Sequence, residues 1–173
     1  MKETLTLINQ LRADGLIGDY AIGGAVGATF YLEPVATMDI DVFVAFRQTS
    51  EIPLISLSPL FDYLKARGCE ARGEYIVIGG WPVQFLPTAD ALGEEALAAA
   101  ITTEVEDVPT RVMTAEHLVA IALQVGRAKD YARMLQFVEA GVLDAAKLDA
   151  ILARHGLQAK WARFEKKYIE DLP

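Results

Sequence analysis

Apolar residues follow two spacings along this chain, one typical of helices and one typical of strands. Residues 3–14 carry apolar side chains every three or four positions, which predicts an amphipathic helix ending near Gly15. Residues 19–23 form a short apolar run that predicts a strand, and residues 24–32 predict a short helix. Apolar side chains occupy alternate positions of residues 39–46, so a second strand is expected there.

The middle of the chain continues this mixture of strands and helices. In order, we expect a loop over residues 47–57, a helix over 58–67 capped by Ser58, a hairpin over 70–87, a helix over 88–101 and a strand over 104–113. The hairpin is expected to turn at Gly79 and Gly80, because paired glycines suit a tight turn. We also expect Gly93 to interrupt the alanine-rich helix and Pro109 to kink the strand.

From about residue 110 onward the apolar pattern is helical. Thr114 and Asp144 are each placed to cap a helix, and Gly126 separates the first of these helices from the next. Residues 158–173 predict a last helix whose lysines and aromatic side chains could contact RNA, although such aromatic residues more often pack inward. The chain therefore predicts an α/β (α+β) fold, with a mixed sheet and flanking helices in residues 1–110. A helical C-terminal part, residues 111–173, is expected to pack on this core.

The composition is that of a chain that buries a sizeable core. Of its 173 residues, 53% are hydrophobic and 23% are charged, and no apolar run reaches the roughly 20 residues that span a bilayer. The first residues are unlike a signal peptide, so we expect a cytoplasmic protein without a membrane partner. A net charge of −8 argues against broad binding to nucleic acids, which depends on Lys and Arg. Cys69 is expected to be a buried or half-buried apolar residue, and His117 and His155 to be surface or packing residues.

Two aspartates at the start of the second strand are the first candidates for chemistry. Asp39 and Asp41 are two residues apart and therefore share one face of a strand. Adjacent carboxylates repel each other unless a cation lies between them, and Mg²⁺ prefers such oxygen ligands. Gly23 and Gly24 precede a short helix, which lets backbone N–H groups approach a phosphate. The alternative interpretation of the two aspartates is an acid pair in solvent at a strand edge. The alternative interpretation of the two glycines is a tight turn that binds no ligand.

These residues resemble the signature of a known family. The run IGG, then fourteen residues, then DIDVFV resembles the nucleotidyltransferase superfamily, and its GG form is most similar to the AbiEii-type branch of toxin-related nucleotidyltransferases. The resemblance implies a nucleotidyltransferase-like mixed sheet and a nucleoside triphosphate (NTP) substrate held at Gly23 and Gly24. It further implies Mg²⁺, or Mn²⁺, bound by Asp39 and Asp41.

A second run supports the same resemblance in the helical part of the chain. VGRAKDYARMLQFVE resembles the Arg-x-Lys-Asp helix in the C-terminal half of the AbiEii-type branch. This match implies that Lys129 reaches the active site, that Asp130 helps to fix its position and that Arg127 contributes to substrate binding. Without the resemblance, a solvated basic helix face would be the simpler interpretation of Lys129 and Arg133, which are four residues apart.

The chain departs from the family pattern at one position. The family often carries a third aspartate on the strand that contains WPVQFLP, and Gln84 stands at that place, where it would contact the substrate. Glutamine is neutral and a poor general base, so this departure puts full catalysis in doubt. Glu74 and Asp90 are the carboxylates that could serve instead. A polar residue on an open sheet face is the alternative interpretation of Gln84.

The main hypothesis is a metal-dependent enzyme that moves a nucleoside monophosphate from an NTP to a hydroxyl group. The resemblance implies an acceptor such as a tRNA 3′ end, a protein hydroxyl or an aminoglycoside, and a toxin that has an antitoxin protein as its partner. The alternative is a catalytically weakened protein of this fold that binds a nucleotide or a protein partner. A third hypothesis is an unrelated α/β domain with an incidental acid pair, which a structure with Asp39 and Asp41 away from Gly24 would establish.

Overall fold

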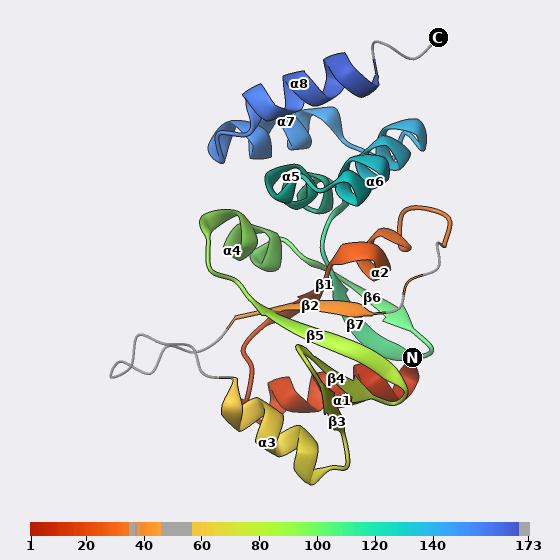
Figure 1. The fold of residues 1–173 in the computed structure, drawn as a ribbon, viewed down its shortest axis with the longest axis vertical. Helices are drawn as coiled ribbons and strands as arrows, with labels where there is room; N and C mark the ends of the chain where they lie inside the picture. The colour runs from red at the N-terminus through yellow and green to blue at the C-terminus, as the bar shows by residue number, and fades with distance from the viewer. Residues whose placement is uncertain (35–36, 38, 46–56, 170–173) are drawn as a thin grey trace.

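The computed structural model describes residues 1–34, 37, 39–45 and 57–169. Within these residues, seven strands form one mixed sheet in the order β3-β4-β5-β2-β1-β7-β6 (Figure 1). The strands are β1 (Tyr20–Ile22), β2 (Ile40–Val44), β3 (Glu70–Arg72), β4 (Tyr75–Ile78), β5 (Trp81–Pro87), β6 (Ile101–Val105) and β7 (Val108–Val112). Nearly all of the loop expected over 47–57 lies outside the described residues, as do residue 46 and residues 170–173.

The eight helices of the described residues cover both faces of the sheet. They are α1 (Lys2–Ala13), α2 (Gly24–Ala28), α3 (Ser58–Ala66), α4 (Ala91–Ala98), α5 (Ala115–Val125), α6 (Ala128–Glu139), α7 (Ala145–Arg154) and α8 (Gln158–Tyr168). Helices α1 and α3 lie on one face, whereas α2 and α4 lie on the other with α5 to α8 stacked beyond them (Figure 1). The expected mixed sheet with flanking helices and a helical C-terminal region is therefore confirmed.

The alternating pattern of β2 separates the two faces of the sheet. Ile40, Val42 and Val44 are fully buried and pack with α1 and α3. Asp41 and Phe43 point to the opposite face, toward α2 and the C-terminal helices. The strand begins at Ile40, one residue later than expected, so Asp39 immediately precedes it. One face of β2 therefore stabilises the core, and the other is available for a polar site.

Two segments contain one strand more than the sequence predicted. The segment over 70–87 contains a third strand, because β3 pairs with β4 ahead of the expected β4–β5 hairpin. The segment over 104–113 is an antiparallel pair, β6 and β7, rather than one kinked strand. Its turn lies at Glu106 and Asp107, which adopt positive φ angles of 51° and 63° without being glycine. Such turns are unusual for these residue types, which explains why the sequence pattern did not reveal this one.

Two helix boundaries and one expected interruption of a helix also differ from expectation. Helix α2 ends at Ala28 rather than near residue 32. Helix α3 includes Ser58 as its first residue, so Leu57 occupies the cap position that Ser58 was expected to take. Gly93 does not interrupt α4, because its backbone N–H donates to the Asp90 carboxylate at 2.7 Å and so belongs to the capped first turn.

The C-terminal helices begin and end largely as expected. Thr114 caps α5 and Asp144 caps α7, while Gly126 ends α5 with a φ of 73°. On α8, Phe164 is buried and lies between the rings of Trp161 and Tyr168. The aromatic residues of this helix therefore pack inward, as the simpler interpretation expected. Within the described part of the chain, no helix is long and apolar enough to cross a membrane.

A charged cluster joins α4 to the C-terminal helices. The Glu95 carboxylate accepts hydrogen bonds from Arg154, from His155 Nε2 at 2.6 Å and from the buried His117 at 3.3 Å. Arg154 foremost, helped by the two histidines, lowers the pKa of Glu95 from about 4.5 to about 2, although partial burial opposes this shift. His117 and His155 are thus packing residues, and the pKa of His117 is lowered by its burial.

We expect Glu95→Gln to reduce the free energy of unfolding at pH 7 by about 1–2 kcal/mol, allowing for solvent screening. A carboxylate with a lowered pKa stabilises the fold above its unfolded pKa and loses that effect as the pH falls through the folded value. The deficit of the variant should therefore shrink between about pH 4.5 and pH 2. Urea unfolding at pH 7 and pH 3 measures it, with the exposed neighbour Glu94→Gln as control. Equal deficits at both pH values would contradict this account.

Candidate active site

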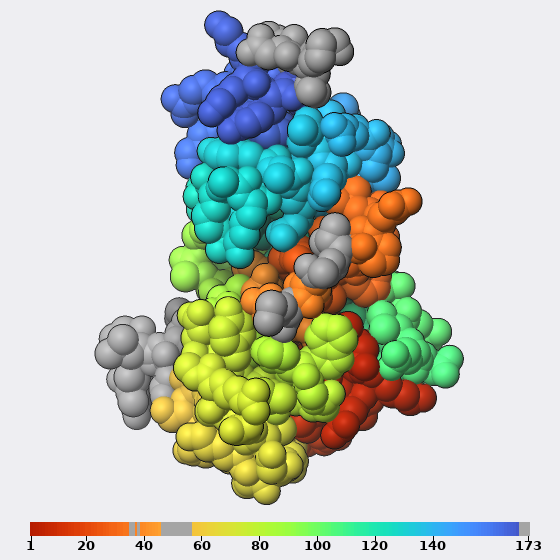
Figure 2. Space-filling model, turned by 45° about the vertical axis from the view of Figure 1, so that its right-hand side comes forward, coloured from red at the N-terminus to blue at the C-terminus, as the bar shows by residue number. Residues whose placement is uncertain are grey.

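A cleft of about 900 Å³ lies between the sheet and the C-terminal helices. Figure 2 shows these helices in cyan and blue on one side, the strands near residue 80 in yellow-green on the other, and residues of α2 and β2 in orange between them. Of the predicted site residues, all but Gly23 line the cleft. They are Gly24, Asp39, Asp41, Gln84, Arg127, Lys129 and Asp130. Residues separated by about 100 positions in the sequence thus meet at one place.

The glycine pair is in direct contact with Asp41, one of the two acids. The Gly23 N–H donates to the Asp41 carbonyl oxygen at 2.9 Å. Gly24 has a φ of 56°, and a Cβ atom at this position would overlap the Asp41 carboxylate. The Thr37 hydroxyl donates to the Asp39 carbonyl at 3.2 Å, which helps to fix the approach to β2. Asp41 therefore lies against Gly24, and Asp39 lines the same cleft, so the separation that would have established an incidental pair is not observed.

Gln84 lies next to Asp41 in the sheet. Strands β2 and β5 are parallel, and their register pairs Asp41 with Gln84. Neighbours in register point to the same face, so the Gln84 amide is beside the acid pair, as the position of the missing third aspartate implied. On the other side of β5, the antiparallel pairing of Ile76 with Val83 places Tyr75 opposite Gln84. A polar row therefore crosses three adjacent strands on the floor of the cleft.

The charge of the acid pair is only partly compensated. Burial is the main cause that raises the pKa of Asp41, and the neighbouring negative charge of Asp39 raises it further. Lys129, Arg133 and Arg127 on and just before α6 oppose this shift from across the cleft. A raised aspartate pKa means that the site favours an additional positive charge. Arg133 was not among the predicted site residues, although its spacing of four from Lys129 gave the signal.

Asp130 holds the start of α6. It is buried, with 2% of its surface exposed, and it accepts hydrogen bonds from the Arg127 backbone at 3.1 Å and from Arg127 Nε at 2.8 Å. Burial alone would raise the pKa of Asp130, but the bonds from Arg127 outweigh it and the pKa is lowered. The carboxylate oxygens of Asp130 are therefore engaged in hydrogen bonds from Arg127. These bonds orient the helical turn that carries Lys129.

The donor set fits a magnesium ion that arrives with a substrate. Among the described residues, no group of three or more His, Cys, Asp or Glu side chains could hold a metal. Mg²⁺ is commonly bound through only one or two carboxylates together with the phosphates of a nucleotide. Asp39 and Asp41 provide two such carboxylates on the same cleft wall, and a cation bound there would offset the burial and the repulsion that raise the pKa of Asp41.

Comparisons with known proteins identify solved structures that have a similar fold. Neither a protein-family model nor a curated protein matches the chain. Among solved structures, an antigenic nucleotidyltransferase-like protein from Paracoccidioides brasiliensis is 12% identical, with a TM-score of 0.54 over 95% of this chain and 93% of that one. ANT(2″)-Ia in complex with adenylyl-2″-tobramycin is 16% identical, with a TM-score of 0.52 over 91% and 98%.

A solution structure of ANT(2″)-Ia gives a similar result, with 17% identity and a TM-score of 0.50 over 94% of this chain and 95% of that one. These likenesses cover almost the whole length of every chain compared, so they concern the complete arrangement of sheet and helices. At such low identities they establish the fold alone. The AbiEii-type branch stays a prediction from the sequence.

Proposed function

We propose, from the nucleotidyltransferase-like fold of this chain, that the protein is a metal-dependent nucleotidyltransferase. It would move a nucleoside monophosphate from an NTP to a hydroxyl acceptor and release pyrophosphate. The observation that carries the proposal is the meeting of Asp39, Asp41 and Gly24 on the cleft floor with Lys129 and Arg133 on the opposite wall. Carboxylates for a metal and cations for phosphates are the two requirements of phosphoryl-group chemistry.

Each of the site residues has a distinct role in the proposed reaction. Asp39 and Asp41 would hold Mg²⁺, or Mn²⁺ in its place, and the bound ion would neutralise charge on the phosphates. The backbone at Gly23 and Gly24 has no Cβ atoms, so a triphosphate can approach it closely. Lys129 would meet the phosphates as a point charge.

Three further residues would support this arrangement. Arg133 adds a second positive charge on the same face of α6, and it opposes the pKa shift of Asp41 together with Lys129. Arg127 and Asp130 keep the first turn of α6 in place. Gln84 would contact the substrate with its amide beside Asp41. Catalysis of this kind depends mainly on positioning and electrostatic stabilisation.

The class of acceptor is a finer part of the proposal. Its candidates come from the similar solved structures and from the sequence resemblance. The ANT(2″)-Ia structure contains adenylyl-2″-tobramycin, so an aminoglycoside hydroxyl is one candidate acceptor. The sequence resemblance to the toxin-related branch adds a tRNA 3′ end or a protein hydroxyl, and an antitoxin protein as a partner. The cleft is lined by both acidic and basic side chains, which suits a nucleotide on one wall and a hydroxyl acceptor on the other.

Transfer of label from α-³²P-NTPs tests the function directly. Each of the four NTPs is incubated with Mg²⁺ and the protein, together with total cellular RNA, a protein extract or tobramycin. We expect label in one acceptor class, and a rate about 100-fold lower for Lys129→Ala because a charge on the phosphates is lost. Lys65→Ala on α3, remote from the cleft, is the matched control and should retain the rate. Absence of label with every NTP and every acceptor would contradict the proposed transfer.

The second candidate function is binding without transfer. It is favoured by Gln84, because the neutral amide stands beside Asp41 where a third carboxylate would complete the site. In that case the protein binds Mg²⁺-NTP, or a protein partner, and the wild type transfers no label. The variant Gln84→Asp then separates the two functions. Transfer that appears only in this variant identifies a binding protein, whereas transfer in the wild type identifies an enzyme.

A further inference from the structure

Transfer to a hydroxyl group requires a group that accepts the hydroxyl proton. The neutral amide of Gln84 cannot do so, and the candidates are therefore the carboxylates that line the cleft. These are Asp39, Asp41, Glu74, Asp90 and Asp130. The hydrogen bonds of each carboxylate decide which one is available.

Two of these carboxylates already accept hydrogen bonds with both oxygens. Asp90 accepts from the Gly93 N–H at 2.7 Å with one oxygen and from Gln124 Nε2 at 2.8 Å with the other. Asp130 is buried and accepts from the Arg127 side chain with both oxygens, at 2.8 Å and 3.1 Å. A carboxylate that is held in this way is a weak proton acceptor, because its lone pairs are already occupied.

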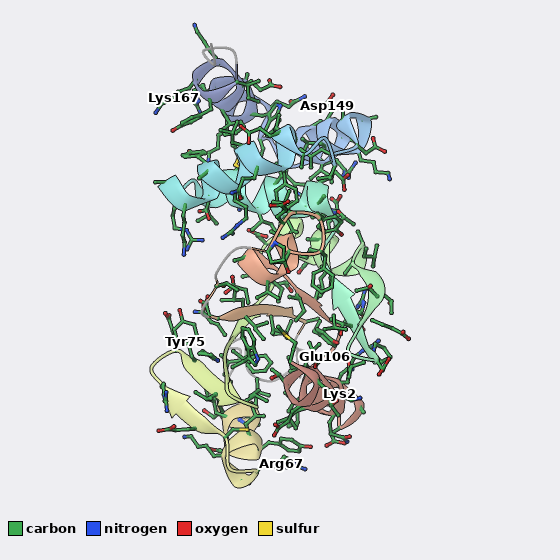
Figure 3. The ribbon with its side chains drawn as sticks, turned by 90° about the vertical axis from the view of Figure 1, so that its right-hand side faces the viewer. Lys2, Arg67, Tyr75, Glu106, Asp149 and Lys167 are labelled. Atoms are coloured by element: carbon green, nitrogen blue, oxygen red, sulfur yellow. The ribbon has the colours of Figure 1, made fainter. Side chains whose placement is uncertain are left out.

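Glu74 is placed differently from the other four. It is exposed in the turn between β3 and β4, directly after Gly73, whose φ is 63°. The next residue, Tyr75, lies opposite Gln84 on the polar row, and Figure 3 shows Tyr75 at the end of the sheet that faces the C-terminal helices. Glu74 thus reaches the cleft from the wall opposite Lys129 and Arg133.

Tyr75 connects Glu74 to the metal-binding acids. Partial burial raises the pKa of the Tyr75 hydroxyl, and the nearby charges and hydrogen bonds of Asp39 and Glu74 raise it further. The hydroxyl has a single proton, so it can donate a hydrogen bond to either of these carboxylates, one at a time. It would hold Glu74 close to the acid pair without itself accepting a proton.

We propose, resting on the nucleotidyl transfer proposed above, that Glu74 is the general base of this site in place of a carboxylate at position 84. The acceptor O–H transfers its proton to a Glu74 oxygen as the acceptor oxygen forms a bond to the α-phosphorus of the NTP. The bond between the α-phosphorus and the bridging oxygen breaks, and pyrophosphate leaves with that electron pair. Tyr75 is a positioning residue for Glu74.

Glu74→Gln tests this role, with Glu70→Gln as the matched control on β3. Glu70 is exposed and pairs with Arg72 away from the cleft. The readouts are pyrophosphate release from the preferred Mg²⁺-NTP, with its acceptor or with water, and NTP affinity by isothermal titration. We expect a rate at least about 100-fold lower for Glu74→Gln, with affinity within about threefold of wild type. A structural role would lower the rate and the affinity together, whereas the loss of a proton acceptor lowers the rate alone.

A rescue variant makes the test specific to the proton acceptor. Adding Gln84→Asp to Glu74→Gln places a carboxylate beside Asp41. The double variant should therefore be at least about tenfold faster than Glu74→Gln alone. A wild-type rate in Glu74→Gln, an equal loss of rate and affinity, or no rescue by Gln84→Asp would each overturn the role of Glu74 while leaving the transferase itself standing. A wild type that binds NTP but releases no pyrophosphate would overturn both proposals.

Discussion

Replacing Asp39 and Asp41 together by asparagine is expected to remove metal-dependent binding of NTPs and to leave the protein folded. The two carboxylates share the cleft with Gly24 and face the basic side chains of α6. Asparagine keeps the size of each side chain but removes the charges that would attract Mg²⁺. Isothermal titration of each Mg²⁺-NTP should show at least about 100-fold weaker binding, equivalent to about 2.7 kcal/mol.

The exposed Asp149→Asn on α7 is a suitable control for this double variant. Loss of binding in the double variant alone would support a nucleotide site at residues 23–41. Tight binding that survives the double substitution would move the site elsewhere. If the wild type itself binds no NTP, the fold would be a scaffold for another partner.

The single variant Asp41→Asn should also be more stable than the wild type at neutral pH. Burial and Asp39 raise the pKa of Asp41 in the folded state. A carboxyl group with a raised pKa contributes its full stability below its unfolded pKa and loses it as the pH rises through the folded value. The ionised Asp41 thus destabilises the fold at pH 7, and asparagine removes this cost. Urea midpoints should be higher for the variant at pH 7 and should converge near pH 3; a lower midpoint at pH 7 would contradict the prediction.

Gly24→Ala should be the most damaging single substitution in the cleft. An alanine Cβ would overlap the Asp41 carboxylate, and the φ of 56° is itself unfavourable for alanine by about 1 kcal/mol. Relief of the overlap requires Asp41 or the turn at Gly23 to move. We therefore expect a lower urea midpoint and NTP binding that is weaker by about 100-fold, because the metal-binding acid is displaced.

Gly80→Ala separates the overlap from the backbone strain. Gly80 has a similar positive φ of 82°, but a Cβ atom there would meet no atom within 4 Å. This control should lose a comparable part of its stability from strain and should bind NTP as the wild type does. The explanation for Gly24 would fail if both variants bound NTP equally well.

Local patterns in the sequence predicted the centre of this fold and missed features that depend on distant pairing. The alternation of Ile40, Val42 and Val44 correctly separated the buried face of β2 from the face that carries Asp41. The resemblance of the glycine and aspartate pairs to the nucleotidyltransferase signature implied that they belong to one site. Tyr75 reaches the site through the β4–β5 hairpin that Gly79 and Gly80 predicted, although Tyr75 itself was not among the predicted site residues.

The missed β6–β7 turn has a different physical cause. Sequence signals for tight turns depend on glycine and asparagine, which adopt positive φ angles readily. Here Glu106 and Asp107 adopt these angles, and the Glu106 carboxylate accepts from the backbone N–H of Lys2 at 2.6 Å. Figure 3 shows Lys2 and Glu106 side by side. A contact across 104 positions thus accompanies a turn that the local sequence does not favour.

The distribution of the two tryptophans gives each part of the molecule its own optical reporter. Trp81 begins β5 and packs against the core shared by α1, α3 and the sheet. Trp161 lies on α8 and packs against the core that the C-terminal helices share with α2 and α4. Single-tryptophan proteins, made with Trp81→Phe or Trp161→Phe, would therefore report fluorescence from one core at a time. The cooperativity between the sheet and the helices that close the cleft thus becomes a measurable property of the intact chain.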